Sequence, residues 1–162
     1  MLLGRVELGA AAAADWPSFY AEHRLAPLLR SAVDAGALPA GGARAIEAVI
    51  ERLPELAGPP EPPARLHGDL WGGNVLAARD GRPYLIDPAA YGGHREVDLA
   101  MLRLFGAPSP RMLAAYEEAH PLADGHERRQ PLWQLFPLLV HAVLFGGSYG
   151  AAAVRAARRA AP

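Results

Sequence analysis

A proline-rich run near the middle of the chain constrains the fold more than any other feature. Residues 58–63 read Gly-Pro-Pro-Glu-Pro-Pro, and proline cannot donate the backbone hydrogen bonds of a helix or of a central strand. Such a run forms a stiff, extended connector. The spacing of apolar residues is helical before this connector and changes after it, so the connector ends a helical segment.

Two helices are predicted before the connector. Asp15 followed by Trp16 and Pro17 is typical of a helix start, with aspartate as the N-cap and proline in the first turn. Pro27 should kink or break this helix. Apolar residues at positions i, i+3, i+4 and i+7 counted from Ile46 predict the second helix.

Short β-like runs follow the connector before helical spacing returns. Residues 74–77 and 83–86 flank a turn signal at Arg79-Asp80-Gly81, which predicts a hairpin. The predicted later helices cover residues 97–105, 109–116 and about 128–160, the last divided near Gly146-Gly147. The fold class predicted from this order is mainly α with a small β-hairpin insertion (α+β).

Composition excludes several classes of function. The 162 residues, 51% of them apolar, suffice for one domain with a sizeable core and not for two. The chain has no cysteine, which excludes disulfides and thiol catalysis, and its net charge of −1 gives no electrostatic argument for nucleic acid. Neither a signal peptide nor a membrane span is predicted, so we expect a cytoplasmic protein without membrane or nucleic-acid partners.

All 16 basic residues are arginine. This chain therefore cannot supply a P-loop lysine, a Schiff-base lysine, or the lysine that holds ATP phosphates in protein kinases.

Three residues between positions 66 and 105 have a spacing suited to phosphoryl transfer from Mg-ATP. That reaction needs a carboxylate beside the attacking hydroxyl and oxygen ligands for Mg²⁺. Asp69 and Asn74 lie five residues apart on one irregular loop, so Asp69 can face the hydroxyl while the Asn74 side-chain carbonyl reaches the metal. Asp87, at the far end of the predicted hairpin, would supply the other metal ligand.

This pattern resembles a known superfamily and, more closely, one family within it. The spacing His-x-Asp-x-x-x-x-Asn, followed by a hairpin and an aspartate, resembles the catalytic and metal-binding loops of protein-kinase-like enzymes. The glycine after His67 and the hydrophobic-Asp-Pro end resemble the aminoglycoside phosphotransferase and choline kinase branch. The closer resemblance, over roughly residues 16–159, is to the fructosamine kinase (ketosamine 3-kinase) family. It rests on HGDLWGGN at 67–74, IDPA at 86–89, YGGHREVDLAM at 91–101, LFPLLVH at 135–141 and LFGG at 144–147.

The resemblance implies the C-terminal lobe of a protein-kinase-like fold and a specific reaction. Members of the family use ATP as cosubstrate, with Mg²⁺, to phosphorylate the 3-hydroxyl of ketosamines, and the unstable product decomposes, which repairs glycated amines. By position, Asp69 would be the general base, Asn74 and Asp87 metal ligands, and His67 a support for the loop. The expected partner is a small-molecule or protein-bound ketosamine.

The chain also departs from the family pattern. The family has an N-terminal lobe with a β-sheet, a nucleotide-covering loop and a phosphate-binding lysine, whereas only 66 residues precede His67 here, and they predict helices. We expect residues 15–162 to form the catalytic C-terminal lobe and residues 1–14 a leader or interlobe remnant, with an N-terminal lobe as a candidate partner. The alternatives are another small-molecule phosphotransferase, of aminoglycoside or choline type, and a non-catalytic remnant that binds a ligand or a partner chain.

The residues around this loop have two interpretations each. Trp71 can form a wall for a sugar ring or serve as a packing residue. His67 is expected to be buried and hydrogen-bonded rather than reactive. Asp98 is expected to accept backbone hydrogen bonds from the catalytic loop, the supporting role that such sites require. The histidines show no zinc spacing, so a structural zinc site is not expected.

Overall fold

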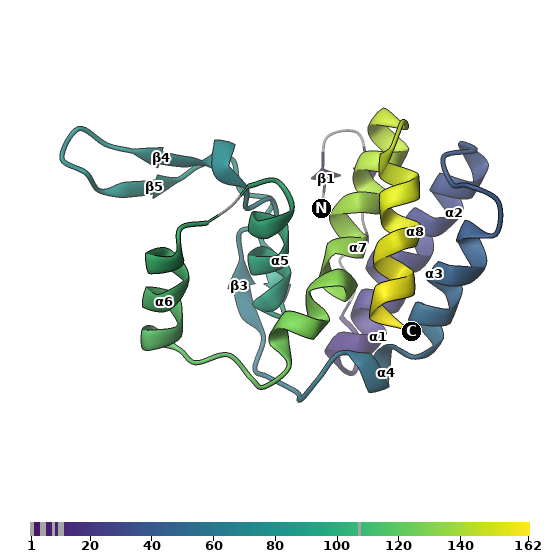
Figure 1. The fold of residues 1–162 in the computed structure, drawn as a ribbon, viewed down its shortest axis with the longest axis horizontal. Coiled ribbons are helices and arrows are strands. Elements are labelled where there is room, and N and C mark those ends of the chain that lie inside the picture. The colour runs from purple at the N-terminus through teal and green to yellow at the C-terminus, as the bar shows by residue number, and fades with distance from the viewer. Residues whose placement is uncertain (1, 4–5, 8, 10–11, 107) are drawn as a thin grey trace.

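In the computed structural model, helices packed side by side form the main core, and a smaller region with short strands extends from them (Figure 1). The structure describes residues 2–3, 6–7, 9, 12–106 and 108–162. Its α-helices are α1 (Trp16–Tyr20), α2 (Ala26–Asp34), α3 (Gly42–Glu51), α4 (Leu53–Leu56), α5 (Glu96–Leu104), α6 (Pro110–Ala119), α7 (His126–Phe145) and α8 (Tyr149–Ala160). Its strands are β1 (Leu2–Leu3), β2 (Val6–Glu7), β3 (Ala64–Leu66), β4 (Val75–Ala77), β5 (Pro83–Leu85) and β6 (Tyr91–Gly93).

The first helical segment begins where the sequence predicts. The Asp15 side chain accepts a hydrogen bond from the backbone N–H of Ser18 at 2.8 Å, as an N-cap does. A π-helical turn, η1 (Ala21–Leu25), then joins α1 to α2, whose first turn contains Pro27. Pro27 cannot donate to the carbonyl of His23, four residues earlier, and Nη1 of Arg24 donates to that carbonyl at 2.8 Å. The predicted break is therefore a local change of helical pitch.

Helix α7 lies at the centre of the bundle. Its buried residues occupy consecutive positions from Leu132 to Val140, so the helix is covered on most sides, as its nearly uniform apolar sequence predicts. Pro137 lies inside this helix and deprives the Trp133 carbonyl of its usual amide donor. The buried Tyr20 hydroxyl donates to the Trp133 carbonyl at 3.2 Å and accepts from the Phe136 N–H at 3.3 Å. A side chain from α1 thus repairs the interrupted hydrogen-bond ladder of α7.

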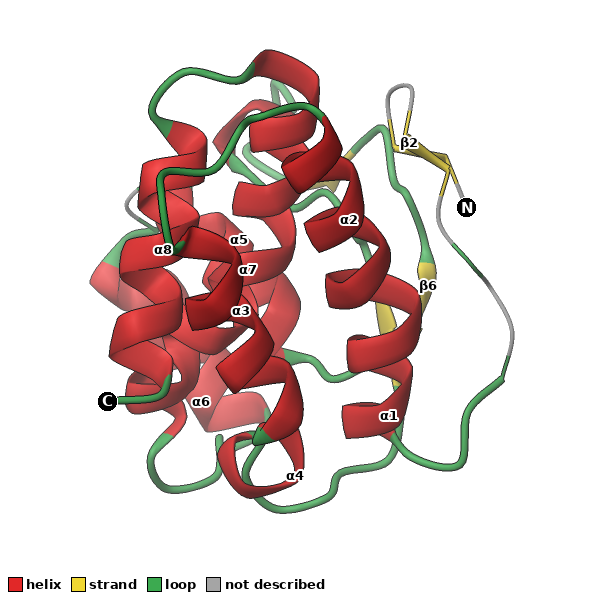
Figure 2. Ribbon diagram, turned by 90° about the vertical axis from the view of Figure 1, so that its right-hand side faces the viewer, coloured by secondary structure: helices red, strands yellow, loops and turns green. Residues whose placement is uncertain are grey.

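The strands form separate two-stranded antiparallel pairs. The predicted hairpin is present as β4 and β5, with Val75 opposite Leu85. The sequence did not predict β3 pairing with β6, in which Leu66 lies opposite Tyr91, or the short β1–β2 pair. These strands are only two or three residues long, and β6 ends in two glycines, so they lack the alternation that marks a strand. Figure 2 shows β6 beside α1 and α2.

The predicted mainly α fold with a small β insertion is confirmed. Residues 58–63 form no helix or strand, as expected for the proline-rich connector. Helix α6 begins at Pro110 and buries none of its residues, and the hydroxyl of its N-cap Ser109 accepts a hydrogen bond from the Met112 N–H at 3.1 Å. Within the described ranges, every helix is too short or too polar to cross a membrane.

Candidate functional site

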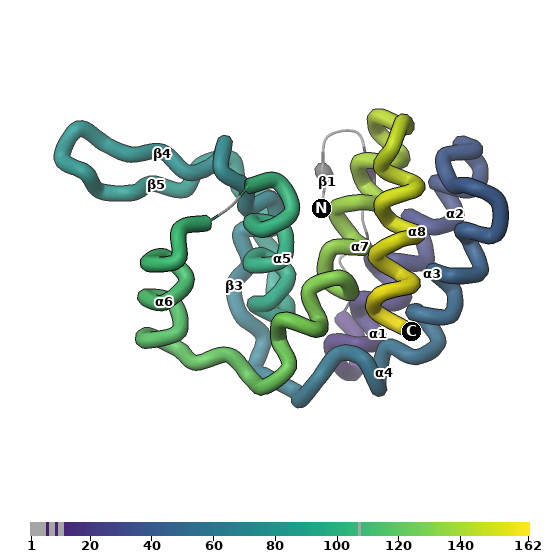
Figure 3. The backbone as a smooth tube through the Cα atoms, viewed as in Figure 1, coloured from purple at the N-terminus to yellow at the C-terminus, as the bar shows by residue number. Residues whose placement is uncertain are grey.

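The predicted site residues His67, Asp69, Trp71 and Asn74 lie on the irregular segment that leaves β3 and enters β4, and Asp87 follows β5. The tube in Figure 3 follows this path from β3 to the projecting β4–β5 hairpin. A short 3₁₀ turn, η2 (Gly72–Asn74), completes the segment. Because β3 is held by β6, and β6 leads directly into α5, the segment is anchored at its start by residues that are distant in sequence.

Asp98 on α5 holds the beginning of this loop. Its two carboxylate oxygens accept hydrogen bonds from the backbone N–H groups of His67, at 2.7 Å, and Gly68, at 3.0 Å. Burial raises the pKa of Asp98, and the two N–H donors oppose that rise. The predicted contact between Asp98 and the loop is therefore present.

His67 forms hydrogen bonds with both segments of the site, the loop after β3 and the residue before Asp87. Its Nδ1 accepts a hydrogen bond from the Asp69 N–H at 3.3 Å, so Nε2 carries the proton and donates to the Ile86 carbonyl at 2.9 Å. Both bonds are satisfied by the neutral ring. His67 is hydrogen-bonded as expected but is half-buried where a buried ring was expected. Its supporting role for the loop remains a prediction.

Gly68 is required by the close approach of two backbone segments. Its φ of 81° lies in the left-handed region. A Cβ atom at this position would collide with the carbonyl oxygen of Ala89. Glycine therefore lets the loop pack directly against the segment that follows Asp87.

Asn74 and Asp69 are in direct contact. Nδ2 of Asn74 donates to the Asp69 backbone carbonyl at 2.8 Å and to Asp69 Oδ2 at 3.2 Å. These bonds fix the orientation of the buried amide and leave its Oδ1 as the atom able to accept or to ligate. The Asn74 carbonyl also accepts from the Ile86 N–H at 3.1 Å, which brings the residue before Asp87 to Asn74.

Asp87 has an unusual backbone conformation. Its φ of 51° makes it the one non-glycine residue with positive φ in the described part of the chain, and its side chain is exposed. Such a conformation costs of the order of 1 kcal/mol or more and occurs often at functional sites. The structure thus brings Asp69, Asn74 and Asp87 to one end of the β4–β5 hairpin.

The donor set at this end fits a hard cation that retains other ligands. Asn74 Oδ1 and the Asp87 carboxylate are oxygen donors of the type that Mg²⁺ prefers, and Mg²⁺ commonly takes only one or two protein carboxylates besides phosphate and water. No group of three or more His, Asp or Glu side chains suited to a metal occurs among the described residues. These two oxygen donors therefore suit a cation that is also bound by phosphates. They do not make a complete metal site by themselves.

Trp71 lies on the loop with its ring against the backbone of Gly73. A Cβ atom on Gly73 would collide with the indole ring of Trp71. The side chain is nevertheless 41% exposed, so one part of the ring packs on the loop while the rest faces outward. This geometry leaves both interpretations of Trp71, sugar wall and packing residue, in place.

Sequence reasoning missed His141, which helps to line a small pocket with Asp69. The pocket's lining residues are Gly68, Asp69, Val97, Asp98, Met101, Phe136, Pro137, Val140 and His141. Nδ1 of His141 bonds the Pro137 carbonyl at 2.8 Å, which assigns the ring proton to Nδ1 in the neutral form. The ring of Phe105 lies 4.5 Å from that of His141. The signals in the sequence were the run LFPLLVH at 135–141, which ends at His141, and a histidine within the apolar part of this helix.

The run His94-Arg95-Glu96 forms buried structural contacts. Glu96 accepts from Nη2 of Arg129 at 2.6 Å and from Nε1 of Trp133 at 2.7 Å, while Arg95 forms a two-point ion pair with Glu61 at 2.7 and 3.0 Å. These contacts tie α5 to α7 and to the proline-rich connector. They hold the helix that carries Asp98.

Comparison with known proteins gives consistent matches. The model of the family described as "Fructosamine kinase" matches residues 2–160. A protein of Klebsiella aerogenes named "Probable ketoamine kinase" is 41% identical over 135 residues, covering 83% of this chain and 46% of that protein. A protein of Thermus thermophilus with the same type of name is 39% identical over 154 residues, covering 95% of this chain and 56% of that protein.

A solved structure also matches along nearly the whole chain. A crystal structure from Thermobifida fusca, provisionally named a fructosamine-3-kinase, is 53% identical with a TM-score of 0.93, covering 98% of this chain and 55% of the other. The chain thus spans about half the length of the curated relatives and of the solved structure that it matches.

Proposed function

The chain belongs to the fructosamine kinase family, and from this membership we propose that it forms the catalytic half of an ATP-dependent ketosamine 3-kinase. The observation that carries the proposal is the hydrogen-bonded set of His67, Asp69, Asn74 and Ile86, which holds the catalytic loop against the residue that precedes Asp87. Family membership supports a kinase and ATP as its cosubstrate. The ketosamine substrate, the residue roles and Mg²⁺ are inferred from the resemblance of the loop.

Asp69 would act on the hydroxyl of the substrate. Its backbone N–H is bonded to His67 and its carboxylate to Asn74, so the side chain is held in one orientation. In the proposed reaction the 3-hydroxyl oxygen bonds to the γ-phosphorus of ATP and its proton passes to the Asp69 carboxylate. The bond from the γ-phosphorus to the bridging oxygen breaks, and ADP leaves with that oxygen.

Asn74 and Asp87 would hold Mg²⁺ against the phosphates. The metal, when bound, neutralises charge that develops on the transferred phosphoryl group. The protein's part is to fix its ligands in advance. The Asn74 amide is oriented by its bonds to Asp69, and the Asp87 backbone is set by the Ile86 N–H bond to the Asn74 carbonyl.

The sugar would bind between Asp69 and two aromatic features. Trp71 offers a partly exposed ring on the loop, and His141, whose ring packs on Phe105, lines a small pocket together with Asp69. Aromatic faces pack well against the apolar faces of sugar rings, and His141 Nε2 is the ring nitrogen left for a bond with a sugar hydroxyl.

The test of the proposal is Asp69→Asn in the longest natural form of the protein. We expect phosphorylation of a model fructosamine to fall by about 10²–10⁴-fold, because the general base is lost while the shape is kept. Mg-ATP binding should change little. Asp87→Ala should instead weaken Mg-ATP binding. Near-normal turnover by Asp69→Asn would contradict the base assignment, and phosphorylation of an aminoglycoside or choline in place of the fructosamine would contradict the substrate class.

The 162 residues by themselves should be a poor kinase. They contain no lysine to hold the ATP phosphates, and positioning of the nucleotide accounts for much of phosphoryl-transfer catalysis. We expect weak Mg-ATP binding and little turnover by this chain alone, measured by calorimetry and a phosphate-transfer assay. Tight binding with steady turnover would show that these residues suffice.

A further inference from the structure

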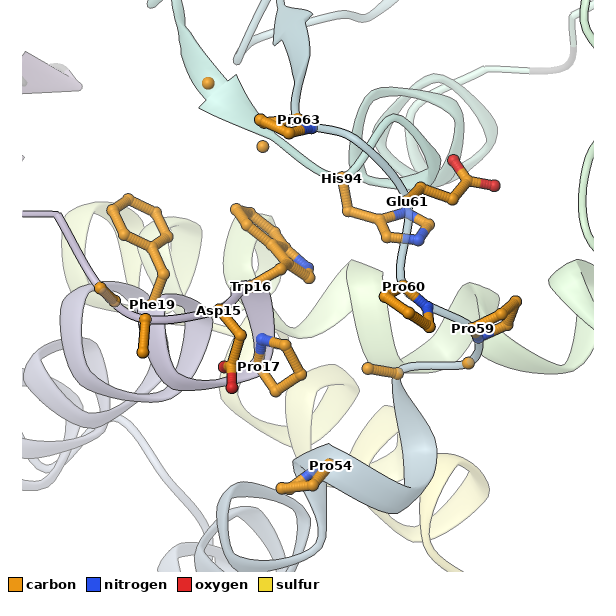
Figure 4. Close-up of a pocket in the computed structure, with 16 residues that line it drawn as sticks. Asp15, Trp16, Pro17, Phe19, Pro54, Pro59, Pro60, Glu61, Pro63 and His94 are labelled. Atoms are coloured by element: carbon orange, nitrogen blue, oxygen red, sulfur yellow. The ribbon is translucent and has the colours of Figure 1, made fainter.

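A cavity of about 570 Å³ lies apart from the proposed catalytic loop. It is bounded by the start of α1, the proline-rich connector, and the Gly92–His94 segment (Figure 4). None of Asp69, Asn74, Asp87 or His141 lines it. Its volume falls within the range of about 300–1,000 Å³ that is usual for small-molecule sites.

The walls of this cavity are mostly flat and apolar. Aromatic and proline rings form them, and Trp16 and Phe19 stack with ring centroids 5.4 Å apart. The proline rings that line it are Pro17, Pro54, Pro59, Pro60 and Pro63. Surfaces of this kind suit a planar apolar group, because stacked rings bury area without ordering flexible side chains.

His94 supplies a hydrogen-bond donor that the protein does not use. The residue is 6% exposed and its ring stacks on Trp133 at 5.1 Å. Its Nδ1 accepts from the Glu96 N–H at 3.3 Å, and burial lowers its pKa, so the ring is neutral and its proton is on Nε2. The hydrogen bond of the His94 ring among the described residues is the one at Nδ1, so Nε2–H can donate to a ligand or to water.

Trp16, which also lines the cavity, supplies a second hydrogen-bond donor. Its indole Nε1–H is buried and has no acceptor in the described part of the chain. Figure 4 shows Trp16 and His94 among the residues that line the cavity. The unmatched polar groups of these two wall residues are therefore both donors.

The carboxylates near the cavity are already engaged. Asp15 accepts from the Ser18 N–H, and Glu61 is held by Arg95, which keeps the pKa of Glu61 low. Figure 4 shows both carboxylates turned away from the space between Trp16 and His94. An anion would lie near these two negative charges, and no arginine lines the cavity to offset them. A cation would face N–H donors. A neutral hydrogen-bond acceptor therefore fits best.

We propose that this cavity is a second ligand site, which takes a neutral, planar, apolar small molecule with a carbonyl oxygen facing His94 Nε2–H. The proposal does not depend on kinase activity. The ring of the ligand would lie among Trp16 and the connector prolines. Its carbonyl would supply the acceptor that the protein lacks.

The test uses benzamide, benzylammonium and benzoate, which share one ring and differ in charge and hydrogen bonding. The chain's three tryptophans give three indole N–H signals in an NMR spectrum, and Trp16→Phe identifies the signal of Trp16. We expect benzamide to move the Trp16 signal saturably, with a dissociation constant on the order of 1 mM. Benzylammonium and benzoate should bind at least about fivefold more weakly, because neither offers a neutral acceptor.

A variant isolates the donor. His94→Phe keeps a ring against Trp133 and removes Nε2–H, so benzamide affinity should fall about fivefold. The comparison among the three ligands on the unaltered chain stands even if that variant folds poorly. The proposal is overturned if none of the three ligands moves the Trp16 signal at a concentration 10-fold above the expected dissociation constant. It is also overturned if all three ligands bind equally, or if benzylammonium binds most tightly.

Discussion

The helical bundle and the catalytic-loop region are held together by different kinds of interaction. In the bundle of α2, α3, α7 and α8, core side chains such as Ile46, Val49 and Leu139 are completely buried. In the loop region, directional bonds from Asp98, His67 and Asn74 fix the backbone. The hairpin beyond them leaves Leu76, Tyr84 and Leu85 about half exposed or more.

This difference separates stability from function within one chain. Apolar burial supplies most of the free energy of folding and is tolerant of small shifts, whereas a site for phosphoryl transfer needs atoms held in fixed directions. Substitutions in the bundle should therefore change the free energy of unfolding, and substitutions in the loop region should mainly change activity. The following predictions test that division.

Leu139→Ala should have the largest effect on folding. The side chain is fully buried in the centre of α7, so truncation removes apolar contacts and leaves a cavity that the neighbours fill only partly. We expect the free energy of unfolding to fall by about 2–5 kcal/mol, as measured by urea denaturation followed by circular dichroism. A loss below about 1 kcal/mol would mean that α7 is not the core of the bundle.

Tyr20→Phe should have the next largest effect. The hydroxyl is the donor for the Trp133 carbonyl that Pro137 leaves without an amide, and its loss leaves buried groups unpaired. The expected loss is about 1–3 kcal/mol in the same measurement. Tyr84→Phe is the matched control, since Tyr84 is 51% exposed on the hairpin. Equal effects of the two changes would contradict the assigned role of the Tyr20 hydroxyl.

His94 should make the domain less stable in mild acid. Burial lowers its pKa in the folded state, while nearby Glu96 and Glu61 oppose and Arg129 and Arg95 assist that shift. Below the unfolded pKa of about 6.5, unfolded chains bind a proton that folded chains do not, so stability falls as pH falls. Unfolding measured from pH 7.5 down to pH 5.5 should show this slope, and His94→Phe should reduce it. An unchanged slope in the variant would assign the dependence to other groups.

Leu85→Ala should have the smallest effect and is the counterpart of Leu139→Ala. Leu85 lies in β5 with 57% of its surface exposed, so truncation removes little buried area. We expect a change within about 0.5 kcal/mol. A loss comparable with that of Leu139→Ala would show that the hairpin is part of the folding core and would remove the distinction between the two regions.

The sequence predicted local features well where one residue's chemistry determines the outcome. Asp15 and Ser109 cap helices, residues 58–63 interrupt regular structure, and the hairpin lies where a turn signal separates two short runs. The spacing of Asp69 and Asn74 also predicted their common loop, because both lie within one short stretch of chain. Their chemical roles remain predictions.

Features that depend on distant contacts could not be predicted. The pairing of β3 with β6 involves three residues on each strand, too few to give a periodic pattern. His141 lies 72 positions beyond Asp69 in the sequence, and only the packing of α7 against the loop brings it to the same pocket. The cavity at Trp16 and His94 likewise depends on where the connector crosses the bundle.

The hydroxyl of Tyr20 and the ring of Pro137 have a consequence for how this sequence could have changed over time. A proline at position 137 without the hydroxyl leaves a carbonyl unpaired in the core, whereas the hydroxyl without the proline only adds a donor to a complete ladder. The cost of acquiring Tyr20 and Pro137 therefore depends on which of the two came first. Ancestors could have acquired the tyrosine first at little cost, and once the proline followed, the tyrosine could no longer be exchanged freely.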